Sequence, residues 1–221
     1  MATPVPLENL KLCGGRRSVT QPTGRVGHWW DFVNILLDDE YGLRRLSCQP
    51  STIVDVGANI GLFSIWARHL FPECRLESYE PNPEVQEYLR SNLRDLGCQV
   101  HLEAVGPTTG HARIKVDRES IVGQCVASPD GEIPMVSLKC VVDRAGGRID
   151  LMKLDIEGGE WDILRGTEPE VFSRIDRLHL EYHESKAGTL SDLIGLASTL
   201  GYRVVQCRPN QGFGLAWLDR G

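Results

Sequence analysis

Two glycines and an acid stand at the end of an apolar run in the stretch TIVDVGANIGLFSIW, residues 52–66. Asp55 interrupts the apolar run, and Gly57 and Gly61 lie on either side of Asn59 in the segment that follows. Glycines reach positive φ and let a ligand approach the main chain, because no Cβ blocks it. A helix-like apolar pattern resumes at once, so the stretch predicts a sharp strand-to-helix turn over a small-molecule ligand.

The spacing of these residues limits which ligand the turn can bind. A dinucleotide fold uses G-x-G-x-x-G to bring pyrophosphate to a helix N-terminus, and the middle glycine is missing here. Asp55 would repel a phosphate and suits a positively charged ligand. Glu80 ends the next apolar stretch, RLESYE, where a carboxylate can accept both ribose hydroxyls of a nucleoside. A nucleoside joined to a cationic amino acid describes S-adenosylmethionine (SAM), which we expect as the cofactor; the alternative is a turn without a ligand.

A second group of polar residues follows two later apolar stretches. Asp155 and Glu181 are each expected near the carboxyl end of a strand, and neighbouring strands lie about 4.8 Å apart. Two carboxylates at that separation can chelate Mg²⁺, which would activate an acceptor hydroxyl. His183 lies nearer the open end of its strand, where it either acts as general base or packs. The predicted catalytic residues are therefore His183, Asp155 and Glu181, and the predicted metal ligands are Asp155 and Glu181.

The motif HLEYH also invites a zinc interpretation, with His179, Glu181 and His183 on one strand face. Along an extended strand the two histidines lie about 13 Å apart, at roughly 3.3 Å per residue. Zn–N bonds of about 2.0 Å cannot join them without a sharp bend, so zinc is not expected. Lys153 shares a strand face with Asp155, and we expect it to form a buried ion pair.

The elements that must position these residues alternate along the chain from Ile53. The expected strands are 53–56, 75–80, 100–105, 150–155 and 177–183, and the expected helices are 62–70, 83–96, one from about 161 and one from 189 to 200. The last apolar segments, YRVVQC and FGLAWL, are joined by RPNQG, which is short enough for an antiparallel hairpin. Alternation of this kind predicts an α/β fold, with a doubly wound, mostly parallel seven-stranded sheet that ends in an antiparallel C-terminal hairpin.

Three segments do not follow the alternation. Residues 106–148 carry short β-rich pieces between Gly, Pro and Asp, and they predict an inserted hairpin or meander. Residues 1–24 predict a loosely ordered arm, and residues 25–46 predict a short helix packed on the domain. Within that helix, His28, Trp29 and Trp30 either form an aromatic lid that stacks on a sugar or pack into the core.

Composition limits the class of protein. The chain has 221 residues, 41% of them hydrophobic and 24% charged, as in globular domains, and its net charge of -6 argues against a general nucleic-acid binder. No run approaches the ~20 apolar residues of a membrane helix, and the start MATPVPLENL lacks the features of a signal peptide. Seven scattered cysteines form neither a disulfide framework nor a zinc site. We expect a soluble cytoplasmic protein with no nucleic-acid or membrane partner; a homodimer stays open.

Several motifs together resemble one known family. VDVGANIGLFS, YEPNP, LEAVG, LMKLDIEGGEWDILRG and LHLEYHE closely resemble the FkbM family of SAM-dependent methyltransferases, over about residues 50–185. The resemblance implies the Rossmann-like class I methyltransferase fold and O-methylation, often of sugars or natural products. It further implies that the methionine end is lined by Asp55, Gly57, Asn59 and Gly61, that Glu80 holds the ribose, and that Asn82 and the main chain near Ala104–Val105 border the adenine.

The chain is accordingly expected to comprise an N-terminal arm and helical cap (1–49) and a methyltransferase domain (50–221) with the β-rich insertion (106–148). The expected activity is transfer of a methyl group from SAM, by in-line displacement, to a hydroxyl of a small acceptor. A sugar or glycoside is the preferred acceptor, with assistance by Mg²⁺. The alternatives are N- or C-methylation of a natural product, a non-catalytic SAM-binding module, and an NAD(P)-dependent oxidoreductase, which would need the missing glycine.

Overall fold

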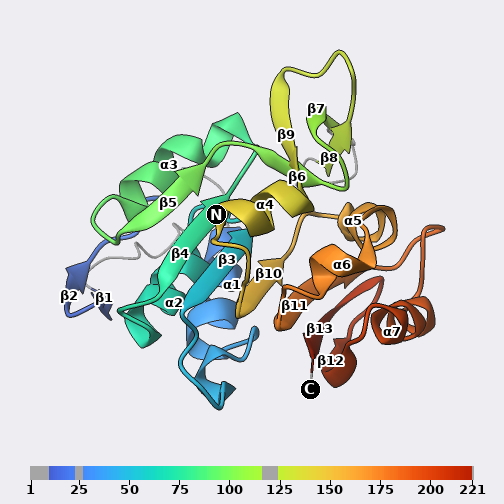
Figure 1. The fold of residues 1–221 in the computed structure, drawn as a ribbon. Coiled ribbons are helices and arrows are strands. Elements are labelled where there is room, and N and C mark those ends of the chain that lie inside the picture. The colour runs from blue at the N-terminus through green and yellow to red at the C-terminus, as the bar shows by residue number, and fades with distance from the viewer. Residues whose placement is uncertain (1–9, 23–26, 116–123, 221) are drawn as a thin grey trace.

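A seven-stranded mixed sheet forms the centre of the structure (Figure 1). The computed structural model describes residues 10–22, 27–115 and 124–220. The strands, in spatial order, are β12 (Arg203–Pro209), β13 (Phe213–Asp219), β11 (Arg177–His183), β10 (Leu151–Leu154), β3 (Thr52–Val56), β4 (Arg75–Tyr79) and β5 (Cys98–His101). Strand β13 runs antiparallel to both of its neighbours, and the remaining pairs are parallel. The predicted doubly wound sheet with a C-terminal hairpin is therefore confirmed.

The central strands β3 and β10 are apolar because helices cover both faces of the sheet. Successive residues of a strand point to opposite faces. Ile53 accordingly packs in the apolar cluster on one face, and Val54 and Val56 pack in the cluster on the other. Two charged residues interrupt this pattern, since Asp55 of β3 lies directly opposite Lys153 of β10 in the strand register. A charge buried in the middle of a sheet is costly unless it is paired, so Asp55 and Lys153 are expected to pair with each other.

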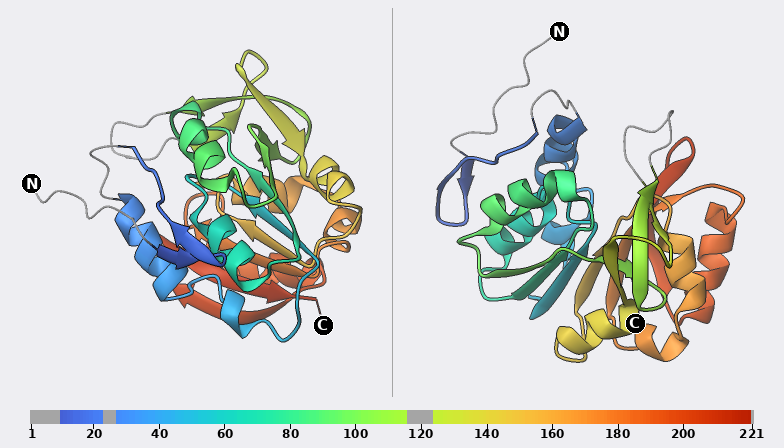
Figure 2. Two further views of the ribbon diagram at one scale, coloured as in Figure 1. Left: turned by 90° about the vertical axis from the view of Figure 1, so that its left-hand side faces the viewer. Right: turned by 90° about the horizontal axis from the view of Figure 1, so that it is seen from above.

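Helices cover both faces of this sheet, as Figure 2 shows from above. They are α1 (Gly27–Phe32), α2 (Leu62–Leu70), α3 (Pro83–Leu93), α4 (Leu138–Arg144), α5 (Glu160–Gly166), α6 (Pro169–Phe172) and α7 (Leu190–Thr199). Their starts follow from capping residues. The Asn82 side chain accepts a hydrogen bond from the backbone N–H of Glu84 at the start of α3, and Thr189 and Asp192 form the predicted capping box of α7.

A smaller four-stranded sheet lies beside the main one, in the order β6-β9-β7-β8. Its strands are β6 (Ala104–Gly106), β7 (Gly110–Lys115), β8 (Gln124–Ala127) and β9 (Ile133–Ser137). The prediction of one strand over 100–105 is wrong in this respect: β5 belongs to the main sheet, whereas β6 pairs with β9 in the small sheet. The apolar pattern is continuous from β5 to β6, so the sequence does not show the break between them. An apolar pattern also does not show with which strand each segment pairs.

The predicted β-rich insertion contains a helix that the sequence did not indicate. Helix α4 begins after Ser137, whose side chain accepts a hydrogen bond from the Cys140 N–H, and it buries Leu138, Val141 and Val142. Fewer than two full turns give too short a periodic pattern to separate a helix from a strand. The insertion thus contains three antiparallel strands, with β7 between β8 and β9, followed by a helix, and it is not a simple meander.

The N-terminal part of the described chain is more ordered than expected. Strands β1 (Leu10–Leu12) and β2 (Gly15–Arg17) form a hairpin where a loose arm was predicted, while residues 1–9 and 23–26 lie outside the described residues. Helix α1 continues into a π-helical segment, η1 (Val33–Leu37), and a 3₁₀ turn, η2 (Leu43–Arg45), follows. These segments contact α2 and so lie against the main domain.

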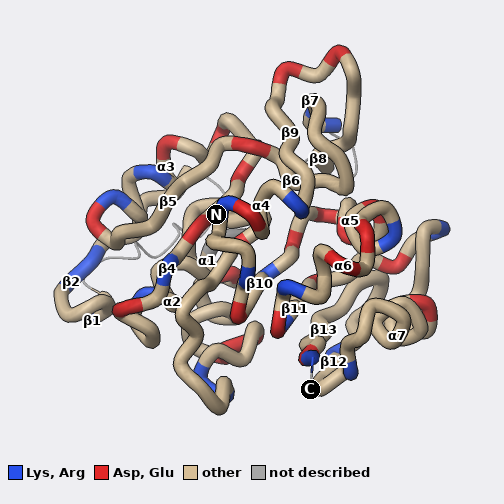
Figure 3. Tube along the Cα trace, viewed as in Figure 1, with Lys and Arg blue, Asp and Glu red and all other residues tan. Residues whose placement is uncertain are grey.

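Charged residues of both signs are interspersed over the elements in Figure 3. That distribution agrees with the net charge of -6, which is carried by 30 acidic and 24 basic residues. Within the part of the chain that the structure describes, the helices are too short or too polar for a membrane crossing.

Candidate functional site

A cavity of about 660 Å³ opens at the carboxyl ends of the central strands. This is the edge of an open parallel sheet at which ligands bind, and the volume is in the range of small-molecule sites, roughly 300–1,000 Å³. The strand ends and the loops that follow them supply Gly57, Asn59, Glu80, Asn82, Asp155 and Glu181 to its wall. The segment before β3 contributes Glu40 and Tyr41, the small sheet contributes Ala104 and Met135, and helices α2 and α3 also line the wall.

The loop after β3 can take its path only with glycine at position 57. Gly57 has φ +79°, and a Cβ at this position would lie 1.7 Å from the carbonyl oxygen of Asp155. The N–H groups of Gly57 and Ala58 both donate to the carbonyl oxygen of Tyr79, at 3.0 Å each. The loop is therefore held against the ends of β4 and β10, with Gly57 and Asn59 facing the cavity.

Gly61 lies behind the cavity wall. It has φ +91° and precedes α2, and a Cβ there would come within 3.1 Å of Leu89 and Leu93 of α3. Its glycine is explained by the turn and by the close approach of the two helices. Gly61 does not line the cavity, although the family resemblance implied that it borders the ligand.

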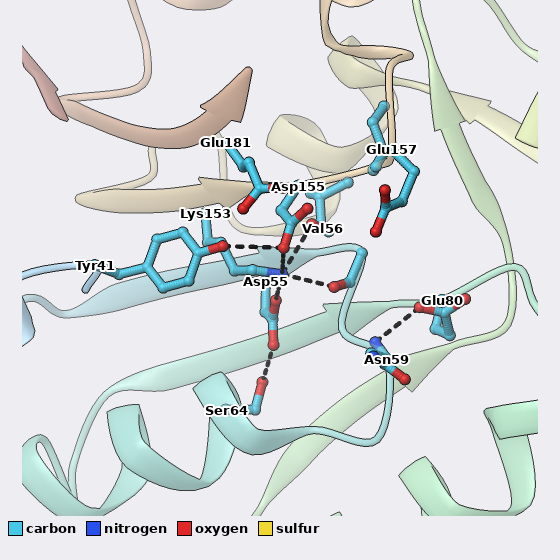
Figure 4. Close-up of polar contacts among 12 residues, drawn as sticks. Tyr41, Asp55, Val56, Asn59, Ser64, Glu80, Lys153, Asp155, Glu157 and Glu181 are labelled. Atoms are coloured by element: carbon cyan, nitrogen blue, oxygen red, sulfur yellow. Dashed lines mark hydrogen bonds and ion pairs between the residues drawn. The ribbon is translucent and has the colours of Figure 1, made fainter. Parts of the chain in front are cut away.

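Glu80 presents its carboxylate at the cavity wall while it is almost fully buried. Its Oε2 accepts a hydrogen bond from the Asn59 N–H at 2.7 Å (Figure 4). Its Oε1 accepts one from the Asn82 N–H at 2.8 Å. Burial raises the pKa of Glu80, and the two backbone donors counteract part of that rise. Each carboxylate oxygen has a second lone pair, so the group retains the capacity to accept two hydroxyls of a diol.

The wall beyond Glu80 is apolar. Ala104 and Met135 of the small sheet line it together with Ile114 and Cys125. Asn82 is also part of the wall, although its side-chain oxygen is already used to cap α3. Asn82, Ala104 and Val105, which the family resemblance implied as the border of the adenine, all lie at this end of the cavity.

Asp55 lies one layer behind the wall and is completely buried. Its Oδ2 accepts a hydrogen bond from the Ser64 hydroxyl at 2.7 Å, and its Oδ1 is 3.2 Å from Nζ of Lys153. The negative charge is therefore compensated inside the protein. The sequence predicted that Asp55 pairs with the positive charge of the ligand, whereas in the structure Asp55 pairs with Lys153.

Lys153 links the two carboxylates with the glycine loop. Its Nζ donates to the carbonyl oxygen of Gly57 at 2.6 Å and lies 3.4 Å from Oδ2 of Asp155, besides its contact with Asp55 (Figure 4). Burial alone would lower the pKa of Lys153, but the charges of Asp55 and Asp155 outweigh it and raise the pKa. The side chain stays protonated, and the expected buried ion pair is present.

Asp155 reaches the cavity with one oxygen engaged. The hydroxyl of Tyr41 donates to its Oδ2 at 2.9 Å, and the same oxygen faces Lys153. No described residue donates a hydrogen bond to Oδ1. Asp155, one of the three predicted catalytic residues, therefore combines a fixed orientation with an oxygen, Oδ1, that can still accept a hydrogen bond.

Glu181 and His183 belong to a charge cluster at the end of β11, of which Glu181 and Glu157 line the cavity. The His183 ring nitrogens lie 3.3 Å from Glu181, 3.5 Å from Glu157 and 3.5 Å from Glu160. Burial opposes the charged ring, but contacts with Glu157 and Glu160 and the charge of Glu181 prevail and raise the pKa of His183 to about 10. An imidazolium cannot accept a proton, and His183 does not line the cavity. The prediction of His183 as general base therefore loses its physical basis.

The residues do not form a magnesium site. Burial and the charge of Asp155 raise the pKa of Glu181, so this carboxyl favours its neutral form. Oδ2 of Asp155 is taken by Tyr41 and by the cation of Lys153. Among residues 10–22, 27–115 and 124–220, no group of three or more His, Cys, Asp or Glu side chains is arranged so that it could hold a metal ion. We derive no step through a metal.

Of the two alternatives for the segment 28–30, the aromatic lid is not found among the described residues. Trp29 stacks on Phe32, with ring centroids 5.5 Å apart. Trp30 is 61% exposed, and neither tryptophan lines the cavity. The side chain of His28 lies outside the described residues.

Comparison with known proteins agrees with this geometry. The sequence profile of the methyltransferase FkbM domain matches residues 55–204. The chain belongs to the FkbM family of methyltransferases. It is therefore a SAM-dependent methyltransferase.

Its relatives include proteins of similar length. The chain is 27% identical to methyltransferase 1 of Beauveria bassiana over 92% of both chains. It is 25% identical to the 31-O-demethyl-FK506 methyltransferase FkbM of Streptomyces tacrolimicus, over 79% of this chain and 81% of that protein. Ribosomal protein L11 methylase of Lactobacillus delbrueckii subsp. bulgaricus has the same fold, with a TM-score of 0.52 and 12% identity over 82% of this chain and 75% of that one.

Within the FkbM family fold, two wall residues escaped sequence reasoning. Tyr41 and Glu40 both lie before the matched domain, in a segment that showed only an apolar helical pattern. Burial, with the charges of Asp155 and Asp31, raises the pKa of Glu40 to about 7. The sequence shows Glu40 and Tyr41 only as polar residues that follow an apolar segment. It does not indicate that these residues fold back onto β10.

Proposed function

We propose that this FkbM-family enzyme is an O-methyltransferase whose proton acceptor is Asp155. The observation that carries the proposal is the placement of Glu80 and Asp155 on the wall of one cavity, with the Gly57 loop between them. The first carboxylate suits a ribose, and the second has a free oxygen beyond it. Cofactor and acceptor would thus meet at the end of β3.

The cofactor half of the cavity is built for a nucleoside without phosphates. Glu80 would hold the ribose hydroxyls, the apolar wall around Ala104 and Met135 would hold the adenine, and the Gly57 loop would border the amino-acid end. SAM supplies an electrophilic methyl group from its sulfonium when bound. The chain contributes orientation, since in-line transfer needs the acceptor atom within near-attack distance of the methyl carbon.

Proton transfer in the acceptor half falls to a carboxylate. The acceptor hydroxyl must lose its proton during methylation, and general-base catalysis of that step is worth about 10²–10⁴-fold. Asp155 lines the cavity and keeps Oδ1 free of donors from the described residues. Glu181 lines the same wall, but burial and the charge of Asp155 raise its pKa, so its carboxyl favours the neutral form and is a poor proton acceptor. His183, as an imidazolium, would compensate the charges of Glu157 and Glu160.

The acceptor is proposed to be a hydroxyl of a small molecule. The relative from Streptomyces tacrolimicus is named for methylation at an oxygen, and this chain shares 25% identity with it. A sugar or glycoside is the first acceptor class that we would test, because the family resemblance includes such substrates. The segment 27–45 lies before the matched domain and supplies Asn34, Ile35 and Glu40 to the wall, so it would set acceptor preference.

The first experiment follows thermal melting with S-adenosylhomocysteine and, in parallel, with NAD. A ligand at 100 times its Kd adds about 2.7 kcal/mol to the free energy of unfolding, or roughly 5–11 °C for a chain of this size. We expect a shift with S-adenosylhomocysteine alone. No shift over a wide concentration range would refute the cofactor site.

The acceptor is then sought by transfer of a labelled methyl group from SAM to a panel of sugars and glycosides, with and without EDTA. Mass spectrometry locates the methyl group on oxygen, nitrogen or carbon. Transfer to oxygen that persists in EDTA supports the proposal. Transfer to nitrogen or carbon would replace O-methylation, and loss of activity in EDTA would restore a metal.

A further inference from the structure

Tyr41 reaches the centre of the site from outside the matched family domain. Its hydroxyl donates to Oδ2 of Asp155 at 2.9 Å, across 114 positions of the sequence. The side chain is only 2% exposed, although it lies in a connecting segment between η1 and η2. Burial of a phenol in such a segment needs support from elsewhere in the fold.

Two strands, β11 and β13, hold the main chain around Tyr41 in place. His179 of β11 contacts its carbonyl oxygen through Nδ1 at 2.7 Å. Burial lowers the pKa of His179 to about 4, so the neutral ring carries its hydrogen on Nδ1 and donates. Trp217 of β13 donates from Nε1 to the carbonyl oxygen of Glu40 at 3.1 Å. The indole also leaves no room for a Cβ on Gly42, which would approach it to 2.4 Å.

The ring of Tyr41 is fixed as firmly as its backbone. It packs edge-on against Phe63 of α2, with ring centroids 5.4 Å apart, and Nζ of Lys153 lies 5.6 Å from its centroid. Burial, with the charge of Asp155, raises the pKa of the Tyr41 phenol. The hydroxyl therefore remains a donor at every physiological pH.

The consequence for Asp155 is a defined orientation of its carboxylate. Tyr41 and Lys153 both contact Oδ2, as Figure 4 shows. A carboxylate fixed through one oxygen exposes the other in a fixed direction. Residues that fix a catalytic group in this way preserve the near-attack geometry, where a displacement of about 1 Å can cost 10²-fold in rate.

We propose that Tyr41 is a positioning residue for methyl transfer: its hydroxyl fixes Oδ2 of Asp155 so that Oδ1 faces the acceptor. This inference rests on the proposed role of Asp155 as proton acceptor. It also assigns the segment before β3 a part in the reaction itself, and not only in the shape of the acceptor wall.

The test compares Tyr41→Phe with Tyr202→Phe. Both variants remove one buried hydroxyl and keep the ring, but the hydroxyl of Tyr202 donates to the carbonyl oxygens of Phe172 and Ile175, and Tyr202 does not line the cavity. Crystal structures of both variants and of the wild type, each with S-adenosylhomocysteine, show the orientation of Asp155. We expect the carboxylate to turn or to occupy several conformers in Tyr41→Phe, and to keep its wild-type orientation in Tyr202→Phe.

Binding and turnover separate this inference from the proposed function. Both variants should bind S-adenosylhomocysteine within about threefold of the wild type; loss of binding in the wild type would instead refute the cofactor site. With an acceptor from the panel, kcat of Tyr41→Phe should fall at least tenfold while the KM for SAM is unchanged. An unaltered Asp155 in Tyr41→Phe would overturn the inference. If Tyr41→Phe does not fold, the wild-type complex with S-adenosylhomocysteine provides the test. Oδ2 of Asp155 facing the sulfur of S-adenosylhomocysteine, in place of Oδ1, would also overturn the inference.

Discussion

The Nζ atom of Lys153 donates to the carbonyl oxygen of Gly57 at 2.6 Å, so the side chain of one strand holds the loop that follows its neighbour. The same ammonium compensates Asp55 behind the cavity and Asp155 on its wall. One buried cation thus ties the expected cofactor loop to the expected proton acceptor. Removing it should affect both stability and binding.

Lys153→Met tests this connection. Methionine fills a similar volume but leaves Asp55 buried without a counter-charge, and breaking a buried pair in this way costs about 3–5 kcal/mol. We expect the melting temperature to fall by roughly 6–20 °C and the affinity for S-adenosylhomocysteine by about tenfold, as the Gly57 loop loses its charged donor. Lys139→Met is the matched control, because Lys139 pairs with Asp143 on the exposed surface. Equal effects of both substitutions would contradict the role of Lys153.

Glu80→Gln tests the ribose site. The substitution keeps the size of the side chain but removes the charge that would bind two hydroxyls. Hydrogen bonds to a charged group are worth about 1.5–3 kcal/mol, so the Kd for S-adenosylhomocysteine should rise about 10–100-fold. Calorimetric titration measures the change, with Glu87→Gln, an exposed residue of the same α3 region, as the control. Unchanged affinity in Glu80→Gln would exclude contact with the ribose.

Asp155→Asn tests the proton acceptor. Asparagine can still accept the hydrogen bond from Tyr41, but it cannot take a proton from the acceptor hydroxyl. We expect turnover to fall about 10²–10⁴-fold, while the affinity for S-adenosylhomocysteine stays within about threefold. The rate is measured by methyl transfer to an acceptor from the panel. Full activity in Asp155→Asn would exclude Asp155 as the proton acceptor.

Local patterns predicted the main sheet because each of its strands carries its own apolar signal. The glycine loop and Glu80 were predictable for the same reason, since both lie at strand ends that the pattern defines. The partner of Asp55 was not predictable, because Lys153 lies almost 100 positions away and only strand register brings the two together. His183 was misjudged for a similar reason: its pKa depends on Glu157 and Glu160, which approach it from another element.

The stability of the fold should depend on the protonation of His179 at mildly acidic pH. Burial lowers the pKa of this ring to about 4, against a usual value near 6.5. The unfolded chain therefore binds a proton below pH 6.5 that the folded chain takes up only near pH 4. The stabilising contribution is fully present above pH 6.5 and is lost as the pH falls toward 4, amounting to about 2 kcal/mol between pH 7 and pH 5.

His179→Asn removes this titration and keeps a donor near the position of Nδ1, so the hydrogen bond to the Tyr41 carbonyl can persist. We expect the variant to be less stable than the wild type at pH 7, because it loses the stacking of His179 on Trp217, at 5.4 Å between centroids. Its free energy of unfolding should nevertheless fall less steeply between pH 7 and pH 5. Urea unfolding at several pH values measures both slopes. Parallel slopes for the two proteins would show that His179 titrates normally, and that the contact that orients Tyr41 is not made by a neutral, buried ring.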